Sequence, residues 1–260
     1  MKINDLVTRK SHNNDIIFQI VDIKDNIFYL KGVDYRLNAD SREEDLQPYN
    51  NVVSLNLPVL ERNKNVAPGK VLHIDGDPIF VKKSQEAYLK YGIDAKCIYL
   101  EEKLMPSAII SLLQQDKYDV LVLTGHDFLK LDKKEDLQDL TRYQNSINFV
   151  SAVQQARKIF PDLDSLVIVA GACQSNYEAL VANGANFASS PTRDNIHMLD
   201  PIIVASIVAI SSVKEYVSPE SVVNKTISKA LGGIETKGKA RLHYSGANEY
   251  GIYNQSLRQN

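Results

Sequence analysis

The chain has 260 residues, of which 44% are hydrophobic, and its 30 basic and 32 acidic residues nearly balance to a net charge of −2. A chain of this length buries a sizeable core and has room for one large domain, or for a small and a medium one. The charges are interspersed, with no long basic block of the kind that follows a nucleic-acid backbone. We therefore expect no nucleic-acid binding.

The sequence also argues against membrane insertion and export. Its longest apolar stretch, Pro201–Ile210, is shorter than the roughly 20 residues needed to cross a bilayer. Met1–Asp5 has no apolar signal-peptide core, so we expect cytoplasmic synthesis and no secretion by a signal peptide. In a reducing compartment the two cysteines, Cys97 and Cys173, are expected as thiols, and Cys97 is interpreted as a buried, inert residue of a separate strand.

Residues 1–62 predict a small β-rich, barrel-like domain. Short alternating apolar runs over 16–23 and 27–33 are separated by polar turns. A domain of this size is near the lower limit for independent folding, so we expect it to dock onto the rest of the chain or onto a partner. Residues 61–69 predict the linker, and 63–260 the second domain.

From Lys70 onwards, predicted strands and helices alternate. The strands are expected at 71–75, 96–100, 120–124, 166–170 and 186–190, and the helices at 80–91, 107–116, 146–160, 177–183, 201–216 and 219–231. Gly232 and Gly233 are expected to close the last helix, and a polar tail begins at Gly238. This alternation is typical of an α/β domain with a doubly wound, mostly parallel sheet.

Two of these strands end just before a reactive side chain. His126 follows the strand at 120–124, and Cys173 follows the strand at 166–170. The carboxyl ends of parallel strands meet at one edge of the sheet, where open α/β sheets bind ligands. A thiol reacts as its thiolate, and a nearby imidazole can take its proton. The pattern therefore predicts a hydrolase with Cys173 as nucleophile and His126 as its base.

Neighbouring groups are candidates for supporting roles. The backbone amides at Gly125 and Ala172 are candidates to stabilise a tetrahedral oxyanion. Asp127 is a candidate to orient the imidazole. Asp194 and Asp200 lie in or beside a turn-rich segment that is expected to border the same edge, and either carboxylate is a candidate to bind a basic substrate side chain.

Two other kinds of site are less well supported. Asp75–Asp77 resembles the Mg²⁺ pocket of a response-regulator receiver, but Thr124–His126 stands where a receiver carries its phosphoacceptor aspartate. Helix capping is the simpler interpretation of these acids. His73, His126 and His197 lack the spacing of a zinc motif, so we expect neither a metal nor another cofactor.

Six sequence blocks, spread over nearly the whole chain, occur together in one known family. They are Val33–Arg36, Leu72–Pro78, Thr124–Asp127, Gly171–Ser175, Ser190–His197 and Gly232–Lys239. In this order they resemble the YabG family of sporulation peptidases. The resemblance implies a cysteine endopeptidase, associated with the forming spore coat, that cleaves spore-coat and related spore proteins after basic residues, chiefly arginine. It also implies His126 and Cys173 as the catalytic pair.

The layout is similar to caspase-like peptidases too, in which histidine follows one core strand and cysteine the next. Those enzymes carry glycine directly after the histidine, whereas here Gly125 precedes His126 and Asp127 follows it. This departure leaves the oxyanion donor near His126 open. Two alternatives to a peptidase are a non-catalytic spore-coat scaffold that binds partners through residues 1–62, and a thiol amidohydrolase acting on small molecules. The sequence predicts no oligomeric state.

Overall fold

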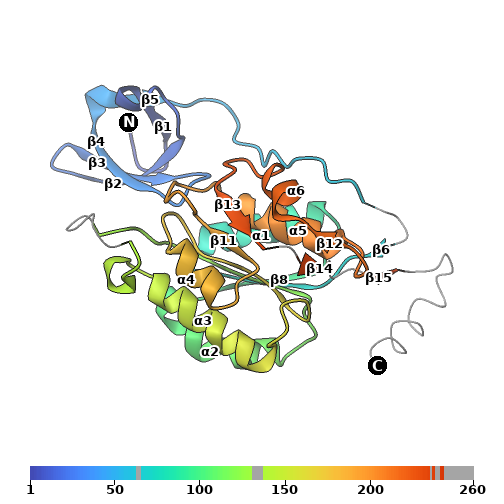
Figure 1. The fold of residues 1–260 in the computed structure, drawn as a ribbon. Coiled ribbons are helices and arrows are strands. Elements are labelled where there is room, and N and C mark those ends of the chain that lie inside the picture. Colours follow the sequence, from blue (N-terminus) through green and yellow to red (C-terminus); the bar gives the residue numbers. More distant parts are fainter. Residues whose placement is uncertain (63–65, 131–136, 235, 238–240, 243–260) are drawn as a thin grey trace.

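The computed structural model describes residues 1–62, 66–130, 137–234, 236–237 and 241–242, which form a mixed α/β protein with two main sheets (Figure 1). Part of the predicted linker, 63–65, and most of the tail from Gly238 lie outside the described residues.

The N-terminal sheet is antiparallel and has the strand order β4-β3-β2-β1-β5. Its strands are β1 (Leu6–Arg9), β2 (Phe18–Lys24), β3 (Ile27–Gly32), β4 (Asn38–Arg42) and β5 (Leu46–Pro48). A small core lies against it, made of Val7, Phe18, Ile20, Phe28, Leu30 and Leu46. No ladder between described residues joins the edge strands β4 and β5, so the sheet curves without closing.

The larger sheet has six strands in the order β13-β11-β10-β9-β7-β8. They are β7 (Val71–Asp75), β8 (Ala95–Tyr99), β9 (Val120–Thr124), β10 (Val167–Ala170), β11 (Phe187–Ser189) and β13 (Leu231–Gly233). The first five are parallel, and β13 is antiparallel to β11. The prediction of a mostly parallel sheet is therefore confirmed.

Helices cover both faces of this sheet (Figure 1). They are α1 (Pro78–Lys90), α2 (Met105–Leu113), α3 (Ser146–Ile159), α4 (Tyr177–Ala182), α5 (Asp200–Ile210) and α6 (Pro219–Val223). Val120 and Val122 of β9 belong to the core under α1 and α5, whereas Leu121 and Leu123 belong to the core under α2 and α3. Side chains alternate along a strand, so a strand buried on both faces is apolar throughout.

The strand order reverses between β7 and β9, because β8 lies on one side of β7 and β9 to β11 follow on the other. In open α/β sheets, ligands bind at such a reversal, beyond the carboxyl ends of the strands. Asp75 ends β7, and His126 follows β9. The topology therefore places both at the expected ligand-binding edge.

Two helix predictions were wrong near the C-terminal side. The helix expected over 201–216 ends at Ile210 and is followed by β12 (Tyr216–Val217), which pairs with β14 (Thr236–Lys237). The helix expected over 219–231 is the short α6, and Gly232 and Gly233 lie in β13. A Cβ at Gly233 would collide with the backbone of β11, so close strand pairing decides the structure here.

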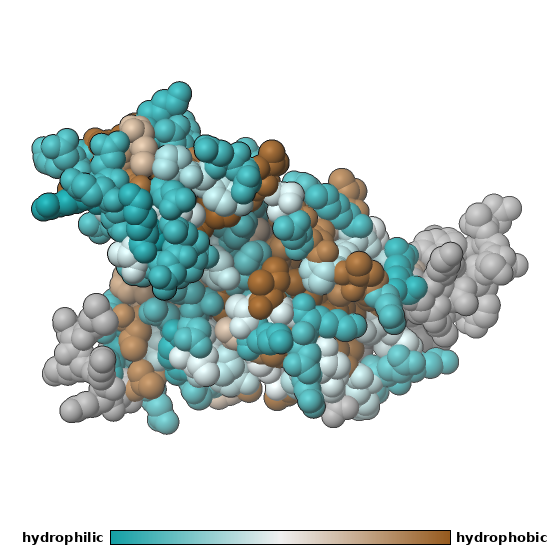
Figure 2. Space-filling view, turned by 90° about the horizontal axis from the view of Figure 1, so that it is seen from above, coloured by the Kyte–Doolittle hydropathy of each residue, from teal (hydrophilic) through white to brown (hydrophobic). Residues whose placement is uncertain are grey.

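The segment after β5 packs onto the core of the larger sheet. Leu55, Leu57 and Leu60 lie against its core, and the Tyr91 hydroxyl donates a hydrogen bond of 2.9 Å to the carbonyl of Pro58. Seen from above in Figure 2, hydrophilic side chains cover most of the N-terminal sheet, and apolar residues gather beside it over the larger domain. None of the helices in the described residues is long and apolar enough to span a membrane.

Candidate active site

His126 and Cys173 follow the carboxyl ends of the adjacent parallel strands β9 and β10. Leu123 of β9 pairs with Ala170 of β10, and each reactive residue stands three positions beyond this pair. The His126 side chain is 31% exposed, whereas Cys173 is 3% exposed. Among the described residues no hydrogen bond joins the two side chains. The two residues therefore follow neighbouring strands, but their side chains do not interact in this structure.

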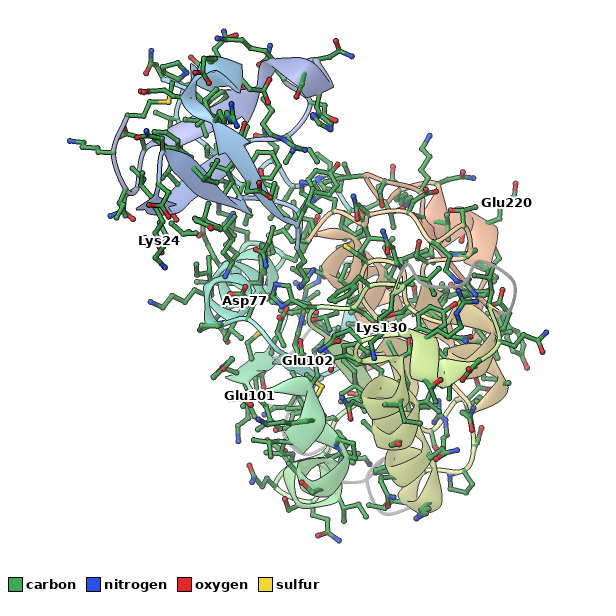
Figure 3. All side chains as sticks on the ribbon, turned by 90° about the vertical axis from the view of Figure 1, so that its left-hand side faces the viewer. Lys24, Asp77, Glu101, Glu102, Lys130 and Glu220 are labelled. Carbon is green, nitrogen blue, oxygen red and sulfur yellow. The ribbon has the colours of Figure 1, made fainter. Side chains whose placement is uncertain are left out.

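Two carboxylates flank the His126 imidazole. Oε1 of Glu102 accepts a 2.7 Å hydrogen bond from the His126 backbone amide and lies 3.8 Å from Nδ1. Oδ2 of Asp77 lies 3.5 Å from Nε2 and also 2.5 Å from Nζ of Lys31, which comes from β3. Figure 3 shows Asp77 at the start of α1 and Glu102 on the neighbouring segment after β8. Among the described residues, no three metal-ligating side chains are grouped to hold an ion.

Glu102 occupies a space that only glycine backbones leave open. A Cβ at either Gly76 or Gly125 would collide with its carboxylate. Burial raises the pKa of Glu102, but the neighbouring His126 side chain and the hydrogen bond from the His126 backbone amide outweigh burial and lower it below its ordinary value. Gly125 therefore makes room for an anionic carboxylate, which disfavours a developing oxyanion at this backbone position.

Cys173 is held by the backbone of Ile196. Its Sγ accepts from the Ile196 amide at 3.4 Å and donates to the Ile196 carbonyl at 3.8 Å. Burial raises the pKa of the thiol, and the Ile196 amide and the Arg36 guanidinium only partly offset that effect. In this state the sulfur is a neutral thiol at neutral pH.

Asp127 binds the loop that carries Cys173, not the imidazole. The buried carboxylate accepts hydrogen bonds from the hydroxyls of Ser146, at 2.5 Å, and Ser175, at 2.9 Å, and from two backbone amides. It thereby joins the start of α3 to the loop after β10. The orienting role considered for Asp127 at His126 has no hydrogen bond to support it among these contacts.

The amide of Ala172 is also engaged, since it donates to the Ser175 hydroxyl at 2.9 Å. In this structure it is therefore not free to bind an oxyanion.

The two candidate pocket acids lie in different environments. Asp194 is exposed and accepts a hydrogen bond from the Thr192 hydroxyl. Asp200 is buried at the start of α5, and accepts from the amide of Ile227 at 2.7 Å and from the amide and hydroxyl of Ser228. Burial raises the pKa of Asp200. The structure gives neither carboxylate a contact with Cys173.

The acids after β7 do more than cap a helix. Asp77 accepts from the Ile79 amide at 2.9 Å, which confirms its capping role for α1. Asp75 is fully buried, accepts from the Thr124 hydroxyl at 2.8 Å and forms an ion pair with Arg36 of the N-terminal sheet's β3–β4 loop. Burial alone raises the pKa of Asp75, but the charge of Arg36 and contacts with His73 hold it well below its ordinary value.

Sequence reasoning missed Glu102 and Arg36 as parts of this site. Glu102 had a usable signal, because it follows a strand that ends at the same edge as those before His126 and Cys173. Arg36 had none beyond its place in a sequence block, since packing of the β3–β4 loop against the larger sheet brings it to the edge.

The family model described as YabG peptidase U57 matches residues 2–56 and 58–245. The "Sporulation-specific protease YabG" of Bacillus subtilis (strain 168) is 37% identical over 281 residues, which cover 93% of this chain and 97% of that protein. No solved structure matches the chain. The chain therefore belongs to the YabG peptidase U57 family and is a homologue of a sporulation-specific protease.

Proposed function

We propose that this peptidase is a cysteine endopeptidase in which Cys173 is the nucleophile and His126 the general acid and base. Its substrates in this proposal are spore-coat and related spore proteins, cut after basic residues, chiefly arginine. The observation that carries the proposal is the shared position of His126 and Cys173, three residues beyond one paired position on adjacent parallel strands.

The chemistry needs one proton carrier and one nucleophile. His126 accepts the Cys173 proton, the thiolate attacks the scissile carbonyl carbon, and His126 then protonates the leaving amine as the C–N bond breaks. Water hydrolyses the resulting thioester and restores the thiol. Glu102 orients the imidazole from its Nδ1 side, and the amide of Cys173 serves as an oxyanion donor in place of the engaged Ala172 amide.

The test compares wild-type protein with Cys173→Ala and Cys97→Ala on a mixed peptide library, with products sequenced by mass spectrometry. We expect cuts after arginine from the wild type and from Cys97→Ala, and none from Cys173→Ala. Cys97 is a matched control because burial raises the pKa of its thiol to about 12, which leaves it unreactive. Cuts that persist in a folded Cys173→Ala variant would refute thiol catalysis.

A further inference from the structure

The loop between β3 and β4, residues 33–37, extends from the N-terminal sheet to the edge of the larger sheet where His126 and Cys173 lie. The amide of Gly32 donates to the carbonyl of Leu37 at 2.7 Å, and a Cβ on Gly32 would collide with a carbonyl inside the loop. Nζ of Lys83, on α1, lies 2.5 Å from the carbonyl of Val33. The loop is therefore a tight turn fastened to the larger domain.

The backbone of this loop pairs with the segment beside Cys173. Tyr35 forms an antiparallel bridge with His197, and the amide of Met198 donates at 2.8 Å to the carbonyl of the residue before Tyr35. Residues 34–36 thus lie along residues 196–198 as a short added strand. Many proteins bind an extended peptide in this way, through its main chain.

The register of this pairing brings Arg36 to the nucleophile. With Tyr35 opposite His197, Arg36 stands opposite Ile196. Ile196 is the residue whose amide and carbonyl both contact the sulfur of Cys173. The loop covers this region, and Cys173 is 3% exposed.

The side chain of Arg36 is buried at the reversal of the strand order. Its Nη2 pairs with Asp75 and lies 3.5 Å from the Thr124 hydroxyl, and its guanidinium carbon lies 4.6 Å from the centre of the Phe80 ring. A carboxylate below a guanidinium and an aromatic face beside it select arginine over lysine, because lysine lacks the planar, delocalised head group.

This ion pair is incompletely satisfied. Nε and Nη1 of Arg36 are buried without a hydrogen-bond partner among the described residues. A buried charge pair that serves stability alone is normally fully hydrogen-bonded, because otherwise the free-energy cost of desolvating the two charges offsets their electrostatic attraction. This arrangement would allow the guanidinium of another arginine to replace that of Arg36 beside Asp75.

We propose that Asp75, Thr124 and Phe80 form the pocket that binds the substrate's arginine, and that the 33–37 loop fills it as an internal substrate mimic. The inference rests on the proposed peptidase function, for which it names the specificity residue, Asp75, and a segment that holds the resting site closed. A substrate chain replaces residues 34–36 along 196–198 and places its own arginine against Asp75.

The test uses the full chain and agmatine, a small molecule that carries the arginine head group. Arg36→Ala is expected to bind agmatine, measured by calorimetry, and to react with iodoacetamide at Cys173 faster than the wild type. If the wild-type pocket is open for one molecule in ten or fewer, the alkylation rate rises roughly tenfold or more. Arg9→Ala, which removes another arginine stacked on an aromatic ring of the same domain, is the matched control and should behave as wild type.

A second variant guards against misfolding, because removal of Arg36 leaves the buried Asp75 without its partner. Arg36→Ala combined with Asp75→Asn carries no unpaired charge and is expected to expose Cys173 yet to bind no agmatine. Melting curves identify any variant that reacts only because it has unfolded.

The outcomes separate this inference from the peptidase proposal, since neither readout needs peptide cleavage. Agmatine binding that depends on Asp75, together with faster alkylation of folded Arg36→Ala, supports the pocket even if no peptide is cut. Unchanged alkylation and no agmatine binding in folded Arg36→Ala would overturn it, even if the wild type cleaves peptides through Cys173.

Discussion

Glu102 is the carboxylate that fixes the position of His126, through the backbone amide at 2.7 Å and the Nδ1 side of the ring. Gly76 and Gly125 are the two places where a side chain would displace it. In the proposed reaction an imidazole must present one nitrogen to the thiol, and a partner on the other nitrogen sets its orientation and tautomer. Glu102 therefore acts as a positioning residue.

Replacement of Glu102 by glutamine tests this role. Glu102→Gln is expected to lower kcat on an arginine peptide by roughly 10²-fold, because the imidazole loses its oriented partner while the side-chain volume stays the same. A merely structural role would leave the pH profile of kcat unchanged, whereas a positioning role shifts it. Glu101→Gln is the control, since Glu101 pairs with Lys103 at the surface and should keep wild-type kinetics.

The candidate pair His126 and Cys173 could be proposed from the sequence, and Glu102 also had a signal there, whereas Arg36 did not. His126 and Cys173 each follow an apolar run that ends at the same edge, which is a local signal. Arg36 reaches this edge only because the β3–β4 loop packs against the larger sheet, and no local pattern encodes such a contact. Local sequence patterns also could not predict that Asp127 binds Ser146 and Ser175 instead of the imidazole, because these two serines lie on different elements.

The loop after β10 is tied to the buried carboxylate of Asp127 by the hydrogen bond from the Ser175 hydroxyl. Asp127 connects the loop with the first turn of α3, and its partners include two hydroxyls and two amides. The element that carries Cys173 is therefore anchored at its base, while the sulfur itself contacts Ile196 on another segment.

Loss of the hydrogen bonds to Asp127 should destabilise the fold. Asp127→Ala is expected to lower the free energy of unfolding by roughly 3 kcal/mol, since hydrogen bonds to a charged group contribute about 1.5–3 kcal/mol each and buried donors are left unpaired. Urea unfolding measures the change. Asp194→Ala removes an exposed carboxylate and should fall within about 0.5 kcal/mol of wild type. Equal losses in the two variants would contradict the anchoring role.

The secondary structure was predicted best for strands that are buried on both faces of the sheet. The strand at 120–124 is confirmed residue for residue, because an apolar run between turns has one simple solution in such a sheet. Residues 211–215 were expected to continue a helix, but the serines at 211 and 212 compete for backbone hydrogen bonds. Gly232 and Gly233 pair with β11, a contact distant in the chain.

A buried polar network lies where the β3–β4 loop meets the larger sheet. His73 lies 2.9 Å from the Thr124 hydroxyl and 3.0 Å from that of Tyr88, and burial lowers the pKa of His73. Asp75 also has a lowered pKa, through Arg36 and His73, although burial opposes the shift. Both groups have a lower pKa folded than unfolded, so each stabilises the fold above its unfolded pKa, and that stability is lost as the pH falls.

The expected consequence is acid sensitivity that begins below the ordinary histidine pKa of 6.5. The free energy of unfolding should fall as the pH is lowered from 6.5 towards 5, with the loss from Asp75 following only at much lower pH. His73→Gln should flatten the dependence between pH 6.5 and 5. Urea unfolding across this range measures both slopes, and identical slopes would contradict a neutral, buried His73.

The most direct test of the central claim is to map the site of covalent labelling by a peptidyl-arginine chloromethyl ketone. This reagent alkylates the active-site thiol of a cysteine peptidase that accepts arginine, whereas in a serine peptidase it alkylates the catalytic histidine, and peptide mapping by mass spectrometry locates the adduct. We expect one adduct, on the sulfur of Cys173, with loss of peptide cleavage in proportion to labelling. An adduct on another residue that abolishes cleavage, or full cleavage after complete modification of Cys173, would contradict it.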